Sequence, residues 1–255
     1  MRKAAALLLL LLSGACSERL SLEQARRFQD AEQVVASATK PEDYLEAAAR
    51  YEELVQEGVE SGALYYNLGN TYLQAGQRGA AIAAYRRAER YRPRDPYLRA
   101  NLESALPPGA PSLVRETWLD HVLFWQDWLP YPGKARATAG VATLCFLAFA
   151  TLLFWRRSFL RHLAIGLLVM TLLLGASPAV DVLEFETSPR GVVTAEVVAR
   201  KGNAETFEPA FTEPLLEGAE FWILERRGDW IRVRVGGDLD GWIPLSSAAT
   251  RDPLP

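Results

Sequence analysis

Few side chains in this 255-residue chain are suited to acid–base, nucleophilic or metal chemistry. Histidine occurs only at His121 and His162, and cysteine only at Cys16 and Cys145, so neither type clusters along the sequence. Zinc sites and Ser-His-Asp relays need such residues in defined sets, which cannot be assembled from these. Gly133-Lys134 also lacks the upstream glycine with which a P-loop wraps phosphate. We therefore expect a non-enzymatic protein that uses no cofactor and no metal.

Charge gives no further support for catalysis or for binding of nucleic acid. The net charge is only −3, and the carboxylate pair Glu52-Glu53 lies on a predicted exposed helix, where solvated charge is the ordinary explanation. The two cysteines lie far apart in apolar segments, which makes a disulfide framework a poor explanation for them. Recognition of another protein is the better-supported chemistry, and most of the residues for it lie between Leu64 and Pro93.

The stretch Leu64–Pro93 alternates large and small residues at helical spacing, with a break at Gly76 and Gly79. Such a pattern predicts two antiparallel helices that approach closely, because small residues on one helix admit the rings of the other. The layout resembles the tetratricopeptide repeat (TPR), a helix–turn–helix unit with a 34-residue period. An ordinary helical hairpin is the alternative. The resemblance rests on Tyr65, Leu68, Gly69, Tyr72, Ala81, Tyr85, Ala88 and Pro93.

The repeat pattern extends to both sides of this stretch and defines a predicted TPR domain over residues 17–111. Ala47 and Tyr51 lie 34 residues before Ala81 and Tyr85, which indicates a degenerate first repeat. Asp95-Pro96 begins a further helix, as expected of the capping helix that closes the end of a solenoid.

A partner-binding groove is what the TPR resemblance implies for the first helix of the hairpin. Asn67 and Asn70 are similar to the TPR subset that clamps a carboxylate, but the remaining Lys and Arg donors of that clamp are missing. The residues implied to face the groove are Ala63, Tyr66, Asn67, Asn70, Leu73 and Gln74.

Arginines gather on the second helix and in the capping segment. This basic cluster is either an ordinary solvated face or a surface for an acidic partner or lipid headgroups. Its members are Arg86, Arg87, Arg90, Arg92, Arg94 and Arg99.

Residues 1–16 have the charged start, apolar run and small residues of an export signal. The end of this segment also resembles a lipoprotein signal, in which the sulfur of Cys16 is acylated, although Ser13 occupies the usual apolar position. Cleavage by ordinary signal peptidase and lipidation at Cys16 therefore both stay open.

Two apolar runs, residues 137–155 and 163–180, are each long enough to cross a bilayer as a helix. The loop between them, residues 156–162, holds three arginines and is expected on the cytoplasmic side, because short Arg-rich loops stay there. The export signal independently places both flanking parts outside the cytoplasm. Residues 112–136, rich in tryptophan, predict an interfacial helix; a helix docked on the TPR domain is the alternative.

The period changes from 3.6 to 2 in residues 188–250, which predicts a small all-β domain. Strands are expected at Val192–Arg200, Phe221–Glu225 and Trp230–Val235. The spacing of Gly228-Asp229-Trp230 and Asp240-Gly241-Trp242 resembles bacterial SH3-like domains. Trp230 and Trp242 are expected in the core rather than in a ligand platform.

The fold class expected from these parts is a multidomain α + β membrane protein with TPR hairpins, two transmembrane helices and an SH3-like barrel. The TPR stretch is similar to the E-type TPR protein of the Bacteroides aerotolerance (Bat) operons, through Tyr51-Glu52-Glu53-Leu54, LYYNLGN at 64–70 and Asn101-Leu102. The resemblance implies a non-enzymatic scaffold of the bacterial inner membrane, linked to oxygen or stress tolerance. The partners that it implies are von Willebrand A-domain membrane proteins and other Bat proteins, encoded beside a MoxR-type ATPase. The alternative is a cell-wall protein whose SH3-like domain binds peptidoglycan.

Overall fold

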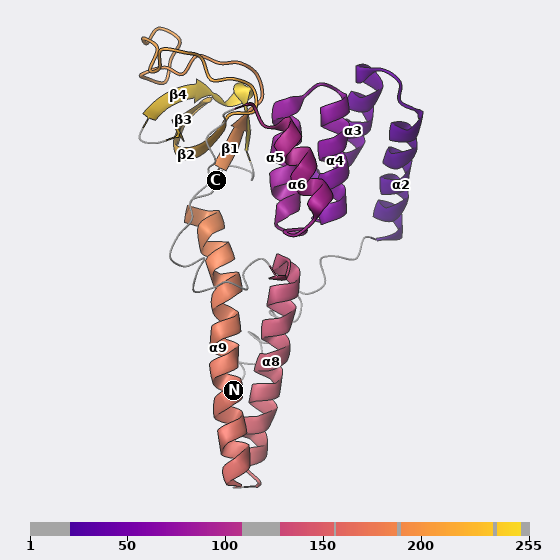
Figure 1. Cartoon of the computed structure of the whole chain (residues 1–255), viewed down its shortest axis with the longest axis vertical. Coiled ribbons are helices and arrows are strands. Elements are labelled where there is room, and N and C mark those ends of the chain that lie inside the picture. The colour runs from indigo at the N-terminus through magenta and orange to yellow at the C-terminus, as the bar shows by residue number, and fades with distance from the viewer. Residues whose placement is uncertain (1–20, 109–127, 156, 188–189, 237–238, 251–255) are drawn as a thin grey trace. The chain divides into compact units, whose positions relative to one another are not determined.

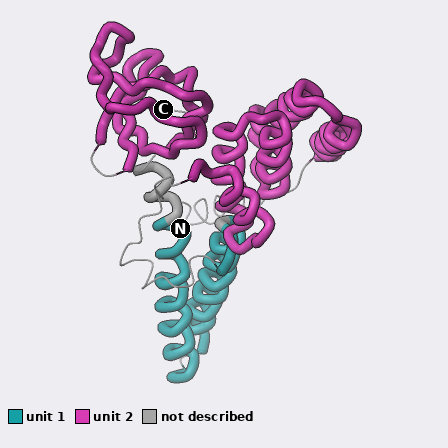
Figure 2. The backbone as a smooth tube through the Cα atoms, turned by 45° about the horizontal axis from the view of Figure 1, so that its top comes forward, with its two compact units in different colours: residues 1–19, 118–185 teal, residues 20–117, 186–255 magenta. Residues whose placement is uncertain are grey.

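The computed structural model describes residues 21–108, 128–155, 157–187, 190–236 and 239–250 (Figure 1). The chain divides into two compact units, one built around residues 118–185 and the other from residues 20–117 and 186–255 (Figure 2). The predicted export signal, Cys16 and most of the predicted interfacial helix lie outside the described residues.

The first part of the larger unit is a stack of five helices, each packed on the next in the sequence (Figure 1). Polar side chains begin several of them: Ser21 and Ser61 accept backbone N–H groups of the first turn, and Asp95 accepts those of Tyr97 and Leu98. The helices are α2 (Leu22–Ser37), α3 (Pro41–Gln56), α4 (Gly62–Gln74), α5 (Arg78–Glu89) and α6 (Pro96–Ala105).

The helix pair expected between Leu64 and Pro93 is present as α4 and α5. Gly76, with φ of +79°, ends α4, as expected of a glycine in the left-handed conformation. Gly69 is the close-approach point, because a Cβ added there would lie 2.5 Å from the ring of Tyr85. Tyr85 and Ala81 are fully buried, so the alternation of large and small residues does build the core.

The second part of the larger unit is a five-stranded antiparallel sheet with the strand order β4-β3-β2-β1-β5. A tight turn at Gly228-Asp229 joins β2 to β3, since Arg227 pairs with Trp230 and Gly228 has φ of +58°. The strands are β1 (Arg190–Val193), β2 (Glu220–Arg227), β3 (Trp230–Val235), β4 (Leu239–Pro244) and β5 (Ala248–Thr250).

The strand predicted over Val192–Arg200 is wrong in its extent. β1 ends at Val193, and beyond it only Val197 and Arg200 form isolated bridges. The carbonyl of Val193 accepts the N–H of Gly218, and the N–H of Thr194 donates to Ser247. Because these bonds satisfy the backbone at the strand end, the chain can leave the sheet there.

The sheet core is formed by alternating side chains of β1 to β4. Phe221, Ile231, Val233 and Ile243 are fully buried. The prediction for the two tryptophans holds only for Trp242, which is buried, whereas Trp230 is half-buried.

In the part of the smaller unit that the structure describes there are two helices, α8 (Tyr131–Leu152) and α9 (Ser158–Thr187). Their segments Pro132–Leu152 and Ser158–Val180 are long and apolar enough to cross a membrane. The buried thiol of Cys145 lies 3.8 Å from the carbonyl oxygen of Ala164, so the two helices are in contact.

The bounds of both apolar helices differ from the predicted ones. α8 begins at Tyr131, before residue 137, and ends at Leu152, before residue 155, whereas α9 extends past both ends of residues 163–180. Arg161 therefore lies in a helix, and the connection is shorter than the predicted residues 156–162 and begins earlier. Backbone hydrogen bonds such as that from Arg161 N–H to the Arg157 carbonyl explain this, because helical pairing continues through polar residues that flank an apolar run.

Candidate protein-binding surface

The predicted groove residues all lie on α4, but they differ in how far they are open to solvent. Ala63 and Gln74 are exposed, whereas Tyr66, Asn67, Asn70 and Leu73 are half-buried. Leu73 packs against the helical core, so its side chain contributes to stability as well as to the surface.

A polar network ties α4 to α5 and α6 at the predicted groove. The Tyr85 hydroxyl donates to Asn70 Oδ1 at 2.8 Å, and Asn101 Nδ2 donates to the same oxygen at 2.9 Å. Asn101 Nδ2 also lies 3.2 Å from the Tyr66 hydroxyl. Burial raises the pKa of Tyr85 to about 12, so this phenol stays protonated and donates at neutral pH.

Asn67 does not provide an open donor for a carboxylate clamp in this arrangement. Its Nδ2 already donates to Glu32 Oε1 at 3.2 Å, and Asn70 uses its Oδ1 to accept two hydrogen bonds from neighbouring helices. A carboxylate from a partner would meet the negative charge of Glu32 rather than a cationic fork. These asparagines therefore join neighbouring helices, and the residues left exposed as candidates for binding are Ala63, Gln74 and, on α6, Tyr97.

Sequence reasoning identified Asn70 but missed what it binds. Asn101 and Tyr85 come from two other helices, and their convergence on one oxygen depends on how those helices pack. The only signal of this network in the sequence was that a polar residue, Asn101, stands next to the apolar Leu102 on the predicted capping helix.

Replacing Asn70 with alanine is expected to destabilise the helical stack by about 1–3 kcal/mol, because it leaves the Tyr85 hydroxyl and the Asn101 amide without their acceptor. Gln74→Ala is the matched control, since Gln74 is an exposed amide on the same helix and should change stability by less than about 0.5 kcal/mol. Denaturant unfolding followed by circular dichroism measures both. Equal stability of the two variants would contradict a structural role for the network.

The basic cluster divides into arginines that contact the chain itself and arginines that face solvent. Arg86 binds Glu220 of β2 through Nε and Nη2, at 2.7 and 2.8 Å, and also binds Glu89. Burial alone would lower the pKa of Arg86, but its bonds to Glu220 and Glu89 outweigh burial and raise it. Arg87 donates to the Thr250 carbonyl of β5 at 2.7 Å. A solvated face is therefore the wrong description for these two arginines.

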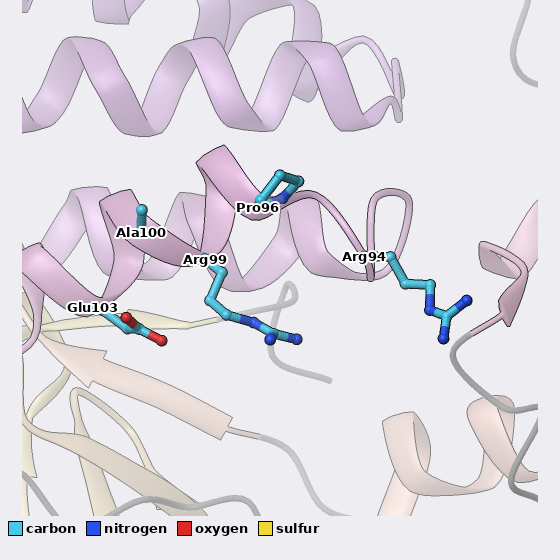
Figure 3. Close-up of a pocket in the computed structure, with 5 residues that line it drawn as sticks. All are labelled: Arg94, Pro96, Arg99, Ala100 and Glu103. Atoms are coloured by element: carbon cyan, nitrogen blue, oxygen red, sulfur yellow. The ribbon is translucent and has the colours of Figure 1, made fainter.

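The other end of the cluster remains exposed. Within the described residues, Arg94 and Arg99 form no ion pair, while Arg92 binds Asp95 at 2.5 Å. Figure 3 shows Arg99 and Glu103 extending from the same side of α6, with Arg94 in the turn before it. Together with Pro96 and Ala100, these residues line an open pocket of about 400 Å³, which could hold an anionic group at its arginine end.

The sheet offers a second, smaller polar site. Hydrogen bonding to Arg234 and its charge, with the charge of Arg232, hold the pKa of Asp240 below its usual value. Arg227 lies over the Trp242 ring at 5.1 Å. The Trp242 ring and the Asp240 carboxylate are thus each engaged by arginines of other strands, which is typical of structural pairs on a sheet.

No metal-binding group of three His, Cys, Asp or Glu side chains is found among the residues that the structure describes. Comparisons with protein-family models, curated proteins and solved structures found no match to this chain. Its function must therefore be inferred from the arrangement of its own residues.

Proposed function

We propose that this chain is a non-enzymatic membrane scaffold, anchored by two spans, whose TPR hairpins bind a partner protein on the extracytoplasmic side. The helical hairpins with their small–large packing support the TPR part of this proposal. The five-stranded sheet, with its turns at Gly228 and Gly236, is compatible with the SH3-like part.

The observation that carries the proposal is the contact between residues on either side of the apolar hairpin. Arg86 precedes both candidate spans and Glu220 follows them, yet the two side chains form a bidentate ion pair. Chain segments that touch lie on the same side of a membrane. The two helices between them must then cross together or not at all, and their length and apolar character favour crossing.

Orientation and partner class come from sequence. The Arg-rich connection favours a cytoplasmic loop, which leaves the helical stack and the sheet in the periplasm of a bacterial inner membrane. The resemblance to the E-type TPR proteins of Bat operons makes von Willebrand A-domain membrane proteins and other Bat proteins the partners to test. Lipidation at Cys16 stays a prediction.

The topology is tested by labelling single cysteines in intact cells, in a Cys145→Ala background. Ser104→Cys in the helical stack and Ser246→Cys in the sheet are both exposed positions and should react with a membrane-impermeant maleimide. Arg157→Cys, in the connection between the apolar helices, should react only after the membrane is permeabilised. If the cysteines of Ser104→Cys and Ser246→Cys reacted from opposite sides of the membrane, the two-span proposal would be refuted. The Cys145→Ala background protein, without an added cysteine, shows how much labelling comes from Cys16.

The scaffold role is tested by affinity purification of the full chain from native membranes in mild detergent. We expect a von Willebrand A-domain protein to co-purify, and Ala63→Arg combined with Gln74→Arg to abolish its recovery while leaving helix content unchanged. The matched control is Glu46→Arg, an exposed change on α3 away from the predicted groove. Recovery of the same partners by the α4 variant would place the binding surface elsewhere.

A further inference from the structure

One face of α5 is covered by the chain's own sheet. Gly79, Ile82 and Arg86 recur at intervals of three and four residues, so they lie on one side of this helix. Val192 of β1 belongs to the same hydrophobic core as Ala81 and Ile82, and β1 and β5 both contact α5. Within the larger unit, this face is therefore an interface between the helical stack and the sheet.

The residues that meet this face form a short acidic turn, Glu217-Gly218-Ala219-Glu220. Glu217 Oε1 accepts the backbone N–H of Gly79 at 2.9 Å, at the N-terminus of α5, where the helix dipole favours a negative charge. At the other end, both oxygens of Glu220 bind the Arg86 fork. Two carboxylates three residues apart are thus held by two different kinds of donor on one helix.

The middle of the turn fits only a small residue in an unusual conformation. Gly218 has φ of +87°, and a Cβ there would lie 2.9 Å from the Ile82 side chain. On the helix side, a Cβ at Gly79 would collide with the carbonyl oxygen of Val193. Glycines on both surfaces therefore permit the close approach that brings the charged pairs within bonding distance.

The charged pair at this interface is withdrawn from water. The Glu220 side chain is 7% exposed and that of Arg86 is 20% exposed. Removing one partner of such a pair leaves an uncompensated buried charge, whereas replacing both with apolar residues is often tolerated. Loss of either charge alone should therefore disrupt the contact, whereas loss of both together should not.

We propose that this face of α5 is a carboxylate-recognition site for an acidic turn of the form Glu-Gly-X-Glu, and that its occupant is residues 217–220 of the same chain. The site holds the helical stack and the sheet together as one body, although the two apolar helices separate them in the sequence. This last step rests on the proposed scaffold function: proteins that bind the chain are confined to other surfaces, such as the exposed positions of α4 and α6.

The test is hydrogen exchange measured by mass spectrometry on the full chain in detergent micelles. Arg86→Met should accelerate exchange on the order of 100-fold or more at the start of α5 and in residues 216–222, because Glu220 is left buried and unpaired. Arg86→Met combined with Glu220→Leu should return these segments to within about tenfold of the unchanged protein. Arg99→Met, a change of an exposed arginine on α6, should leave both segments unaffected.

Two results would overturn the proposal. One is equal exchange in Arg86→Met and Arg99→Met, which would mean that the pair does not hold the sheet. The other is a double variant that exchanges as fast as the single variant, which would mean that Arg86 acts without Glu220. If Arg86→Met unfolds the whole chain, Glu217→Gln provides the readout: faster exchange confined to the start of α5 supports the site, and no change refutes it.

Discussion

Replacing Tyr85 with alanine is expected to lower the free energy of unfolding of the helical stack by about 3–5 kcal/mol. The Tyr85 side chain is fully buried and its ring lies against Gly69 of α4. Its ring centroid is 6.2 Å from that of Tyr66. Gly69 provides no side chain that could fill the space left by the ring, so the variant would contain a large cavity between α4 and α5.

Tyr85→Phe is the matched control because it keeps the ring and removes only the hydroxyl. The lost bond to Asn70 is expected to lower stability by about 1 kcal/mol. Both variants are measured by denaturant unfolding in detergent, with the far-ultraviolet circular dichroism of the helices as the signal. If alanine and phenylalanine were equally destabilising, the ring could not be the packing element that joins these two helices.

The parts of the fold that depend on local pattern could be predicted from sequence. The pairing of α4 with α5 follows from where Gly69, Ala81 and Tyr85 fall in the helical period, and Gly228-Asp229 marked the β2–β3 turn. Element ends were less accurate. β1 ends at Val193, whose carbonyl accepts the N–H of Gly218; this residue is distant in sequence, and alternation along the strand cannot reveal it.

The candidate site shows the same limit. The TPR resemblance implied that Asn70 faces a partner-binding groove, but spacing along α4 cannot tell an open amide from one bound by Tyr85 and Asn101. Arg86 shows this limit more clearly, because the sequence allows its exposure to solvent to be judged only from its position on its own helix. Its partner Glu220 lies 134 residues away in a different kind of structure. Only a folded arrangement could pair them.

Replacing Phe221 with alanine is expected to destabilise the sheet by about 3–5 kcal/mol. Phe221 is fully buried at the centre of the sheet core, among Val193, Ile231 and Ile243. Its ring also lies over Gly191 of the paired strand β1, where a Cβ would be 2.5 Å from the ring. Gly191 provides no side chain that could fill the cavity from β1.

Phe207→Ala is the control for this change, because Phe207 is 47% exposed and its loss should alter stability by about 1 kcal/mol or less.

Phe221→Ala has a further consequence if the sheet and the helical stack are one body. β1 carries Val192 into the helical core, so opening of the sheet removes a packing partner of Ile82 and α5. Hydrogen exchange in α5 should therefore accelerate together with exchange in β2, whereas exchange in α2 should change least. Acceleration confined to the sheet would mean that the two parts unfold independently, and that Arg86 and Glu220 join them only weakly.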